Sequence, residues 1–291
     1  MRTLASIFVL LCVSAQALAQ EKSLVHQEVK RKYIVYTPAL YDSRPTQRFP
    51  VVVNYHGGGM TMREQMLYTQ MNRTADRENF IVVYPQGIKQ DWNVGFGMDY
   101  KDGTDDIGFT AAMLEKIGKD YRVDERRVYA TGLSRGGFFA LRIAAELPHL
   151  FAAVAAVGAP MPQPVVANHS NKTKVGVMLM HGTADQVVSF GGKPGAYLSA
   201  SDSYRYWLTH NELDGAAVRE QKTDRDKFDG TEVISQEQGS GAASVALVSI
   251  KGGGHTWAGA DPFNVGLPIG ATSRDIDANA TIWEFLGRHR R

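Results

Sequence analysis

Short runs of apolar residues alternate along the chain with longer segments that have a helical pattern. The runs are rich in β-branched and aromatic residues and occupy residues 51–55, 80–84, 127–131, 151–157, 175–180 and 244–250. Amphipathic segments of helical length lie near residues 61–79, 106–119, 135–147, 200–212 and 273–287. Because strands without a polar face are covered on both sides, the pattern predicts an α/β fold with a mainly parallel central sheet and helices on both faces.

Residues 214–243 interrupt this pattern, since they are polar and rich in glycine, and we expect them to form a surface loop. No internal repeat, low-complexity tract or Pro/Ser-rich linker divides the chain. A single α/β domain of about 250 residues is common. We therefore expect residues 20–291 to form one catalytic domain rather than two small domains.

The first 19 residues have the pattern of a secretory signal peptide. Arg2 supplies the positive start, residues 4–13 are apolar, and Ala17-Leu18-Ala19 matches a cleavage site of small residues. Cleavage after Ala19 also removes Cys12, the single cysteine of the sequence, so the mature chain depends on its core for stability. We expect a secreted or periplasmic protein. No other segment reaches about 18 uninterrupted apolar residues, so we expect no membrane span.

The charge balance argues against a nucleic-acid partner. Lys and Arg number 32 and Asp and Glu number 30, which leaves a net charge of +2. Such a chain lacks the basic character of a nucleic-acid-binding protein. Basic residues cluster only in Arg288-His289-Arg290-Arg291, which we expect to be a solvated, frayed C-terminus.

The segment Gly132-Leu133-Ser134-Arg135-Gly136 lies between a predicted strand and a predicted helix. In that context G-x-S-x-G is a nucleophile elbow, a strained turn that exposes a serine hydroxyl above the sheet. The two glycines allow strand and helix to approach closely, and the helix N-terminus offers a positive dipole end to a developing oxyanion. Ser134 is therefore the candidate nucleophile, and an accidental Gly/Ser turn is the alternative.

A second glycine-rich segment, His56-Gly57-Gly58-Gly59, follows the first predicted strand. Such a loop places backbone N–H groups opposite the elbow. We assign the oxyanion hole to the amides of Gly58 and Arg135, with Gly57 as a substitute donor. A phosphate cradle is the competing interpretation, but Met60-Thr61-Met62 stands where a P-loop has its Lys-Ser/Thr ending. We expect the histidine of this loop to be a buried brace.

The acid and the base follow from the chain order of serine, acid and histidine in such enzymes. His255 comes just after the last predicted strand, in a glycine-rich segment that we expect to be flexible. Asp185 follows the preceding apolar strand, where a solvated turn is the alternative. The other histidines after Ser134 lie in a helix, in the tail, at a strand end or ahead of any plausible acid: His149, His169, His181, His210 and His289.

Together these residues predict a serine hydrolase. His255 would take the proton of Ser134, Asp185 would fix the imidazole tautomer, and the loop amides would hold the oxyanion. This chemistry needs no cofactor, and no His/Cys cluster has the spacing of a zinc site. Trp92 and Trp257 are candidate walls of the substrate pocket, with packing in the core as the alternative.

Several segments resemble the polyhydroxybutyrate depolymerase-type carboxylesterases, an exported α/β-hydrolase family that includes feruloyl and acetylxylan esterases. The matching segments lie at residues 127–134, 146–148, 151–154, 181–188, 253–257, 276–278 and 283–286. The resemblance implies the α/β-hydrolase fold. It also implies that Ser134, Asp185 and His255 are the triad, in agreement with the elimination above.

We therefore expect a secreted serine carboxylesterase that acts through an acyl-enzyme on small or oligomeric esters. As substrates, we expect acetyl and feruloyl esters to be preferred over short hydroxyalkanoate esters. We expect both to be preferred over crystalline polymer, because the sequence shows no linker or second module that would bind the surface of a solid polymer. Two other functions stay open. One is a serine peptidase of the prolyl-oligopeptidase type, which shares the fold, and the other is a catalytically inactive module that binds a glycan or a partner.

Overall fold

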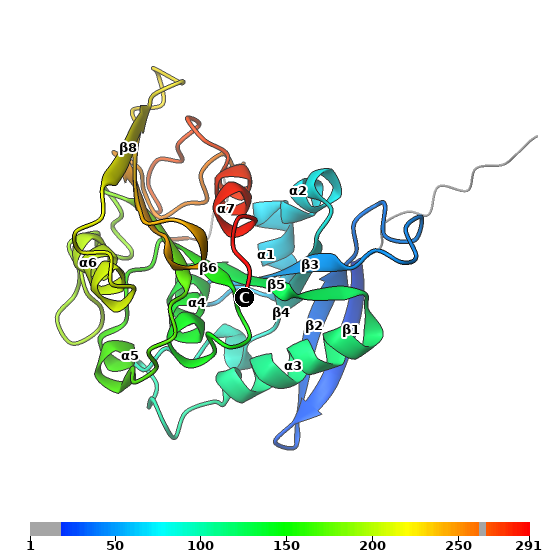
Figure 1. The fold of residues 1–291 in the computed structure, drawn as a ribbon. Coiled ribbons are helices and arrows are strands. Elements are labelled where there is room, and N and C mark those ends of the chain that lie inside the picture. Colours follow the sequence, from blue (N-terminus) through cyan, green and yellow to red (C-terminus); the bar gives the residue numbers. More distant parts are fainter. Residues whose placement is uncertain (1–18, 262–265) are drawn as a thin grey trace, which may run out of the picture.

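A ten-stranded sheet runs through the computed structural model, which describes residues 19–261 and 266–291 (Figure 1). Its strand order is β1-β2-β4-β3-β5-β6-β7-β10-β9-β8. The expected signal peptide lies outside the described residues except for Ala19, which is the first residue of β1. The mainly parallel sheet predicted from the sequence is confirmed.

Six strands form the parallel centre of the sheet, and they coincide with the six apolar runs of the sequence. They are β3 (Phe49–Tyr55), β4 (Ile81–Pro85), β5 (Val123–Leu133), β6 (Ala153–Val157), β7 (Gly176–Gly182) and β10 (Val245–Lys251). Antiparallel hairpins extend both ends of the sheet: β1 (Ala19–His26) with β2 (Val29–Tyr36), and β8 (Val218–Thr223) with β9 (Glu232–Gln238).

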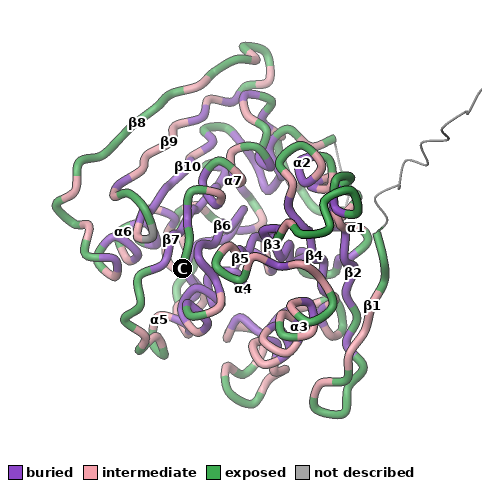
Figure 2. The backbone as a smooth tube through the Cα atoms, turned by 45° about the vertical axis from the view of Figure 1, so that its right-hand side comes forward, coloured by how far each residue is buried: buried purple, intermediate pink, exposed green. Residues whose placement is uncertain are grey.

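The expectation of a surface loop at residues 214–243 is wrong, because this region contains the hairpin of β8 and β9. The hairpin stands out from the rest of the molecule, and most residues of β8 are exposed (Figures 1 and 2). An edge strand held by backbone pairing needs no apolar face, so its sequence lacks the alternation that marks a half-buried strand.

Helices cover both faces of the sheet (Figure 1). Each face carries its own core, because neighbouring strand residues point to opposite sides: Val51 and Val53 lie in one core and Val52 in the other. The first core contains residues of α3 (Asp106–Asp120), α4 (Arg135–Glu146), α5 (Gln163–Asn168) and α6 (Ala200–His210). The second contains residues of α1 (Met62–Thr69), α2 (Met71–Glu78) and α7 (Ala278–Leu286).

Two predicted helices differ from the observed ones. The segment at 61–79 forms α1 and α2, because Gln70 between them has a left-handed backbone with φ of 49°. The last helix begins at Ala278 rather than near 273, because the Asp277 carboxylate accepts a hydrogen bond from the Ala280 amide and caps the helix there. Two short 3₁₀ turns complete the described elements, η1 (Ile88–Gln90) and η2 (Gly241–Ala243).

The C-terminal tail is anchored, so the expectation of a frayed end is wrong at His289. This side chain is 1% exposed and forms a hydrogen bond of 2.9 Å between its Nε2 and the Ser244 hydroxyl. The Tyr129 hydroxyl donates to the His289 carbonyl at 2.7 Å. A methyl group at Gly176 would lie 2.4 Å from the His289 ring, so the ring packs directly on β7.

No helix in the described part of the chain combines the length and the apolar character that crossing a bilayer requires.

The buried His289 predicts how stability depends on pH. Burial lowers the pKa of His289 below its ordinary value of about 6.5. The unfolded chain then binds a proton at a higher pH than the folded chain, so the free energy of unfolding should decrease as the pH falls below about 6.5. Urea denaturation at pH 7 and pH 5 should show this loss. His289→Gln should lower stability at pH 7 by about 1–3 kcal/mol and make the loss smaller. An equal loss in both proteins would contradict this prediction.

Candidate active site

Ser134 lies in a strained turn between β5 and α4, as the sequence predicts. Its φ of 55° and ψ of −118° fall in a region that costs a non-glycine residue about 1–3 kcal/mol. A methyl group at Gly136 would lie 2.2 Å from the carbonyl oxygen of Tyr55, and one at Gly132 would lie 2.5 Å from the carbonyl carbon of Gly136. Both positions therefore require glycine for β3, β5 and α4 to meet at this point.

Asp185 and His255 form a buried hydrogen-bonded pair. The Nδ1–H of His255 donates to Asp185 Oδ2 at 2.6 Å. The other carboxylate oxygen accepts the backbone amides of Val187 and Val188 at 2.9 and 2.8 Å. Burial alone would raise the pKa of Asp185, but hydrogen bonds from His181 and His255 hold this pKa well below its ordinary value. Asp185 is therefore a carboxylate that can orient and stabilise an imidazolium.

The loop that carries His255 is tightly packed, which corrects the expectation that its glycines make it flexible. A methyl group at Gly254 would lie 2.0 Å from the carbonyl oxygen of Ile269. A methyl group at Gly182, at the end of β7, would lie 2.3 Å from the carbonyl oxygen of Gly253. The backbone amide of His255 also donates to Ile269 at 2.5 Å. Glycine is needed here for close approach of backbones, and the approach fixes the imidazole.

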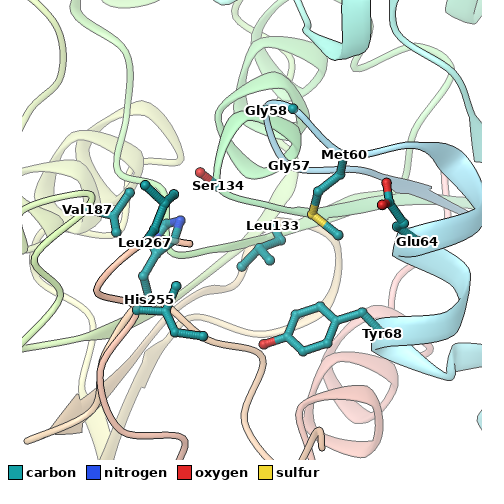
Figure 3. Close-up of a pocket in the computed structure, with 12 residues that line it drawn as sticks. Gly57, Gly58, Met60, Glu64, Tyr68, Leu133, Ser134, Val187, His255 and Leu267 are labelled. Atoms are coloured by element: carbon teal, nitrogen blue, oxygen red, sulfur yellow. The ribbon is translucent and has the colours of Figure 1, made fainter. Parts of the chain in front are cut away.

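Ser134 and His255 open into the same cavity, whose volume is about 450 Å³ (Figure 3). Ser134 follows β5 and His255 follows β10, and Figure 3 draws both among the residues that line the cavity. The remaining lining residues are Gly57, Gly58, Gly59, Met60, Glu64, Tyr68, Leu133, Val187, Leu267 and Ile269. The structure therefore brings the predicted serine, histidine and glycine loop together.

The glycine loop lies directly against the nucleophile turn. A methyl group at Gly57 would be 3.7 Å from the Ser134 Cβ, and one at Gly58 would be 3.6 Å from the Arg135 Cβ. Gly59 has a φ of 76° and donates its amide to Gln90 at 2.9 Å, which fixes the turn of the loop. The backbone of this loop can therefore approach a group bound above Ser134.

His56 braces this loop, as predicted. It is fully buried, its Nε2 accepts the Gly87 amide at 2.9 Å, and its Nδ1 lies 2.8 Å from the Gly57 carbonyl oxygen. Burial lowers the pKa of His56 to about 4, so the ring is neutral at physiological pH. A neutral ring with one donor and one acceptor matches both contacts.

The Arg135 guanidinium forms an ion pair with Asp91 and is not among the groups that line the cavity. It makes two hydrogen bonds to Asp91, at 2.6 and 3.1 Å, and a third to the carbonyl oxygen of Phe96 at 3.1 Å. A bidentate pair of this kind fixes both partners. It ties α4 to the segment that follows β4.

The structure does not place Trp92 or Trp257 on the wall of the cavity. Trp92 is fully buried, stacks on Phe139, and donates its indole N–H to the carbonyl oxygen of His56 at 3.0 Å. Trp257 is 1% exposed and donates its indole N–H to Asn279 at 3.1 Å. An indole that packs on all sides and has its N–H satisfied is a core residue. Packing in the core, the alternative considered for both, describes their positions.

The cavity has walls that were not predicted from the sequence. Glu64 and Tyr68 project into it from α1, and Leu267 and Ile269 come from the segment after His255 (Figure 3). The spacing of Glu64 and Tyr68, four residues apart on a helix that follows the glycine loop, is a signal that could have placed them on one face. The position of Leu267 and Ile269 depends on a long connection and has no such signal.

Within residues 19–261 and 266–291, no group of three or more His, Cys, Asp or Glu side chains is arranged to hold a metal ion.

Comparison with known proteins places the chain among esterases. It is 30% identical over 166 residues to the bifunctional acetylxylan esterase/xylanase XynS20E of Neocallimastix patriciarum, covering 56% of this chain and 23% of that protein. It is 26% identical over 239 residues to feruloyl esterase B of Piromyces equi, covering 77% of this chain and 42% of that protein. The chain thus spans less than half the length of these two relatives.

The fold is shared with solved esterase structures. An acetyl xylan esterase from Aspergillus awamori superposes with a TM-score of 0.65 and 16% sequence identity, over 92% of this chain and 99% of that one.

The family model described as Esterase PHB depolymerase matches residues 32–218, which is more than half of the chain. The chain therefore belongs to the PHB depolymerase esterase family, and it is a carboxylic ester hydrolase with the α/β-hydrolase fold.

Proposed function

We propose that the protein is a secreted serine carboxylesterase whose catalytic triad is Ser134, His255 and Asp185. The observation that carries this proposal is a single cavity that holds a serine in a strained elbow and a histidine paired at 2.6 Å with a buried carboxylate. Neither the strain at Ser134 nor the burial of Asp185 serves packing alone. Both are typical of a site that is organised for nucleophilic chemistry.

The proposed reaction has two halves. His255 Nε2 removes the hydroxyl proton of Ser134 while the serine oxygen attacks the ester carbonyl, and the proton then passes to the departing alcohol. This leaves an acyl-enzyme on Ser134. Water, deprotonated by the same imidazole, attacks the acyl group, and the proton returns to the serine oxygen as the acid leaves. Asp185 keeps Nδ1 protonated throughout and stabilises the imidazolium.

The amides of Gly58 and Arg135 are the proposed oxyanion hole, with Gly57 as the substitute donor. Support comes from the contact of the glycine loop with the elbow and from the position of Arg135 at the start of α4. Backbone amides aimed at a developing negative charge contribute several kcal/mol in a water-poor site, about 2.7–4 kcal/mol for one donor. The neutral His56 fixes the loop without adding a charge that would compete for the oxyanion.

The proposed substrates are acetyl, feruloyl or short hydroxyalkanoate esters that are small enough to enter the cavity. A volume of about 450 Å³ with walls from Met60, Leu133, Val187, Leu267 and Ile269 suits a compact or planar acyl group. The names of the fungal relatives, acetylxylan and feruloyl esterases, agree with this choice. Export is supported by the signal-peptide pattern of the first 19 residues.

The first prediction from the proposed function concerns the nucleophile. Ser134→Ala should reduce the hydrolysis of p-nitrophenyl acetate by about 10⁴-fold or more, because the attacking atom is lost. A fluorophosphonate probe should label the wild type at Ser134 and leave the variant unlabelled, as read by mass spectrometry of the peptides. Ser43→Ala, at an exposed serine, should keep both activity and labelling. Labelling at a different serine would show that the assignment is wrong.

The second prediction concerns the acid. Asp185→Asn should lower kcat by about 10⁴-fold, the loss seen in the serine-protease template, because an amide stabilises the wrong imidazole tautomer. Asp202→Asn, at an exposed helix start, is the matched control and should retain activity. The kcat of both variants and of the wild type, measured by steady-state kinetics on one soluble ester, tests this expectation. Near-normal turnover by Asp185→Asn would remove this residue from the triad.

The third prediction concerns the substrate. Soluble acetyl and feruloyl esters should be hydrolysed with higher kcat/KM than a hydroxybutyrate dimer, and a suspension of crystalline polyhydroxybutyrate should be cleared slowly, because its chains must enter a cavity to reach Ser134. An anilide series measured in parallel reports on peptidase activity. Rapid clearing with negligible turnover of the soluble esters would reverse the ranking, and faster cleavage of anilides than esters would favour a peptidase.

A further inference from the structure

Asp185 accepts hydrogen bonds from two histidines, although the proposed mechanism uses only one. Its Oδ2 accepts from His255 Nδ1 at 2.6 Å and lies 3.1 Å from His181 Nε2. Its Oδ1 is occupied by the amides of Val187 and Val188. From the sequence alone, His181 is expected only to lie at a strand end.

The contacts of His181 define which of its nitrogens carries the proton. Nε2 lies 3.1 Å from the Asp185 carboxylate and 2.9 Å from the carbonyl oxygen of Val188, and both of these atoms are acceptors. A lone pair at Nε2 would be repelled by both, so Nε2 carries a hydrogen that the two oxygens share. Nδ1 is buried and has no hydrogen-bond partner within the described residues, so a second proton there would be unsatisfied. His181 is therefore a donor to Asp185 through its Nε2–H.

The backbone and the packing around His181 make it a rigid donor. It lies within β7, where it is paired in register with Ser249 of β10. Its side chain is 2% exposed and its ring packs against Phe190 at a centroid distance of 5.5 Å. A side chain held by a central strand cannot follow a moving partner, so it fixes the atom to which it donates.

The carboxylate of Asp185 needs such a fixed donor. It belongs to a turn after β7, whereas His255 arrives on a separate loop 70 residues later in the chain. The two backbone amides donate to Oδ1, and Oδ2 is left to donors from other side chains. His181 donates to Oδ2 from a strand that does not carry His255, so both oxygens of the carboxylate have a donor that is independent of the His255 loop.

We propose that His181 is a positioning residue that orients Asp185 Oδ2 toward His255 and so sets the geometry of the proposed triad. The inference rests on the proposed triad and adds a fourth side chain to it. His181 touches neither substrate nor the reacting atoms and acts only through Asp185. The hydrogen bond from its Nε2 also helps to keep the carboxylate ionised, because burial alone would raise the pKa of Asp185.

A purely structural role is the alternative, because His181 also donates to the carbonyl oxygen of Val188 and so closes the turn that follows β7. That role would affect folding and would leave the turnover of each folded molecule unchanged. The experiment must therefore count active molecules and separate kcat from KM.

The test compares three variants. His181→Leu removes the donor and keeps an apolar side chain in the core. His181→Gln offers an amide N–H at the same distance along the side chain as Nε2. His289→Leu is the matched control, because His289 is also a buried histidine with hydrogen bonds but packs against Gly176, at the opposite end of β7 from His181 and Asp185. Circular dichroism establishes folding, and long incubation with the fluorophosphonate probe counts active sites.

His181→Leu should lose up to about 10²-fold in kcat per labelled site with KM nearly unchanged, since misplacement of a catalytic group by about 1 Å has this cost. His181→Gln should recover most of the loss. His289→Leu should be less stable but should turn over normally where it is folded. The far-downfield proton resonance of the His255–Asp185 hydrogen bond should shift or broaden in His181→Leu and stay in place in His289→Leu.

Two outcomes would overturn the inference. In the first, folded His181→Leu keeps the wild-type kcat and the wild-type resonance. In the second, folded His181→Gln is as slow as His181→Leu. If His181→Leu does not fold, His181→Met, which also lacks a side-chain N–H donor, replaces it in each comparison. Failure of the triad itself is distinguishable, since it would appear as activity in Ser134→Ala.

Discussion

The close approach of backbones at the carboxyl edge of the parallel strands is the constraint on which the site depends. At the elbow, Gly136 leaves no room for a methyl group against the carbonyl oxygen of Tyr55. At the other side, Gly182 leaves none against the carbonyl oxygen of Gly253. The first contact forces Ser134 into its strained conformation, and the second sets the loop that carries His255. A side chain at either glycine would move Ser134 relative to His255.

Burial of the Asp185 carboxylate is tolerated because the fold surrounds it with donors. An isolated buried carboxylate is costly, and in an uncompensated site it would take up a proton. Here two backbone amides bind one oxygen, and His181 and His255 bind the other. The same arrangement accounts for the place of Asp185 in a tight turn directly after β7, because this turn presents two amides and a strand histidine to one side chain.

The sequence predicts those parts of the structure that depend on local physics. Apolar runs located the six parallel strands, and the order of serine, acid and histidine selected Ser134, Asp185 and His255, which the structure brings to one region. The hairpin of β8 and β9 escaped prediction because an exposed edge is held by backbone pairing. His289 and His181 escaped because their partners, Ser244 and Asp185, are identified by tertiary contact and not by sequence pattern. The expectation that glycines make the His255 loop flexible was wrong for the same reason, because the backbone contacts that require these glycines are tertiary contacts.

The two tryptophans show how the two cores support one site. Trp92 belongs to the core on one face of the sheet and holds the carbonyl oxygen of His56, at the start of the glycine loop. Trp257 belongs to the core on the other face and directly follows the His255 loop through Thr256. Each core therefore fixes one side of the cavity, and the elbow of Ser134 lies between them at the edge of the sheet. The walls of the cavity come from α1 and from the segment after His255, and Tyr68 of α1 joins the two, since its hydroxyl accepts the Trp257 amide at 3.0 Å.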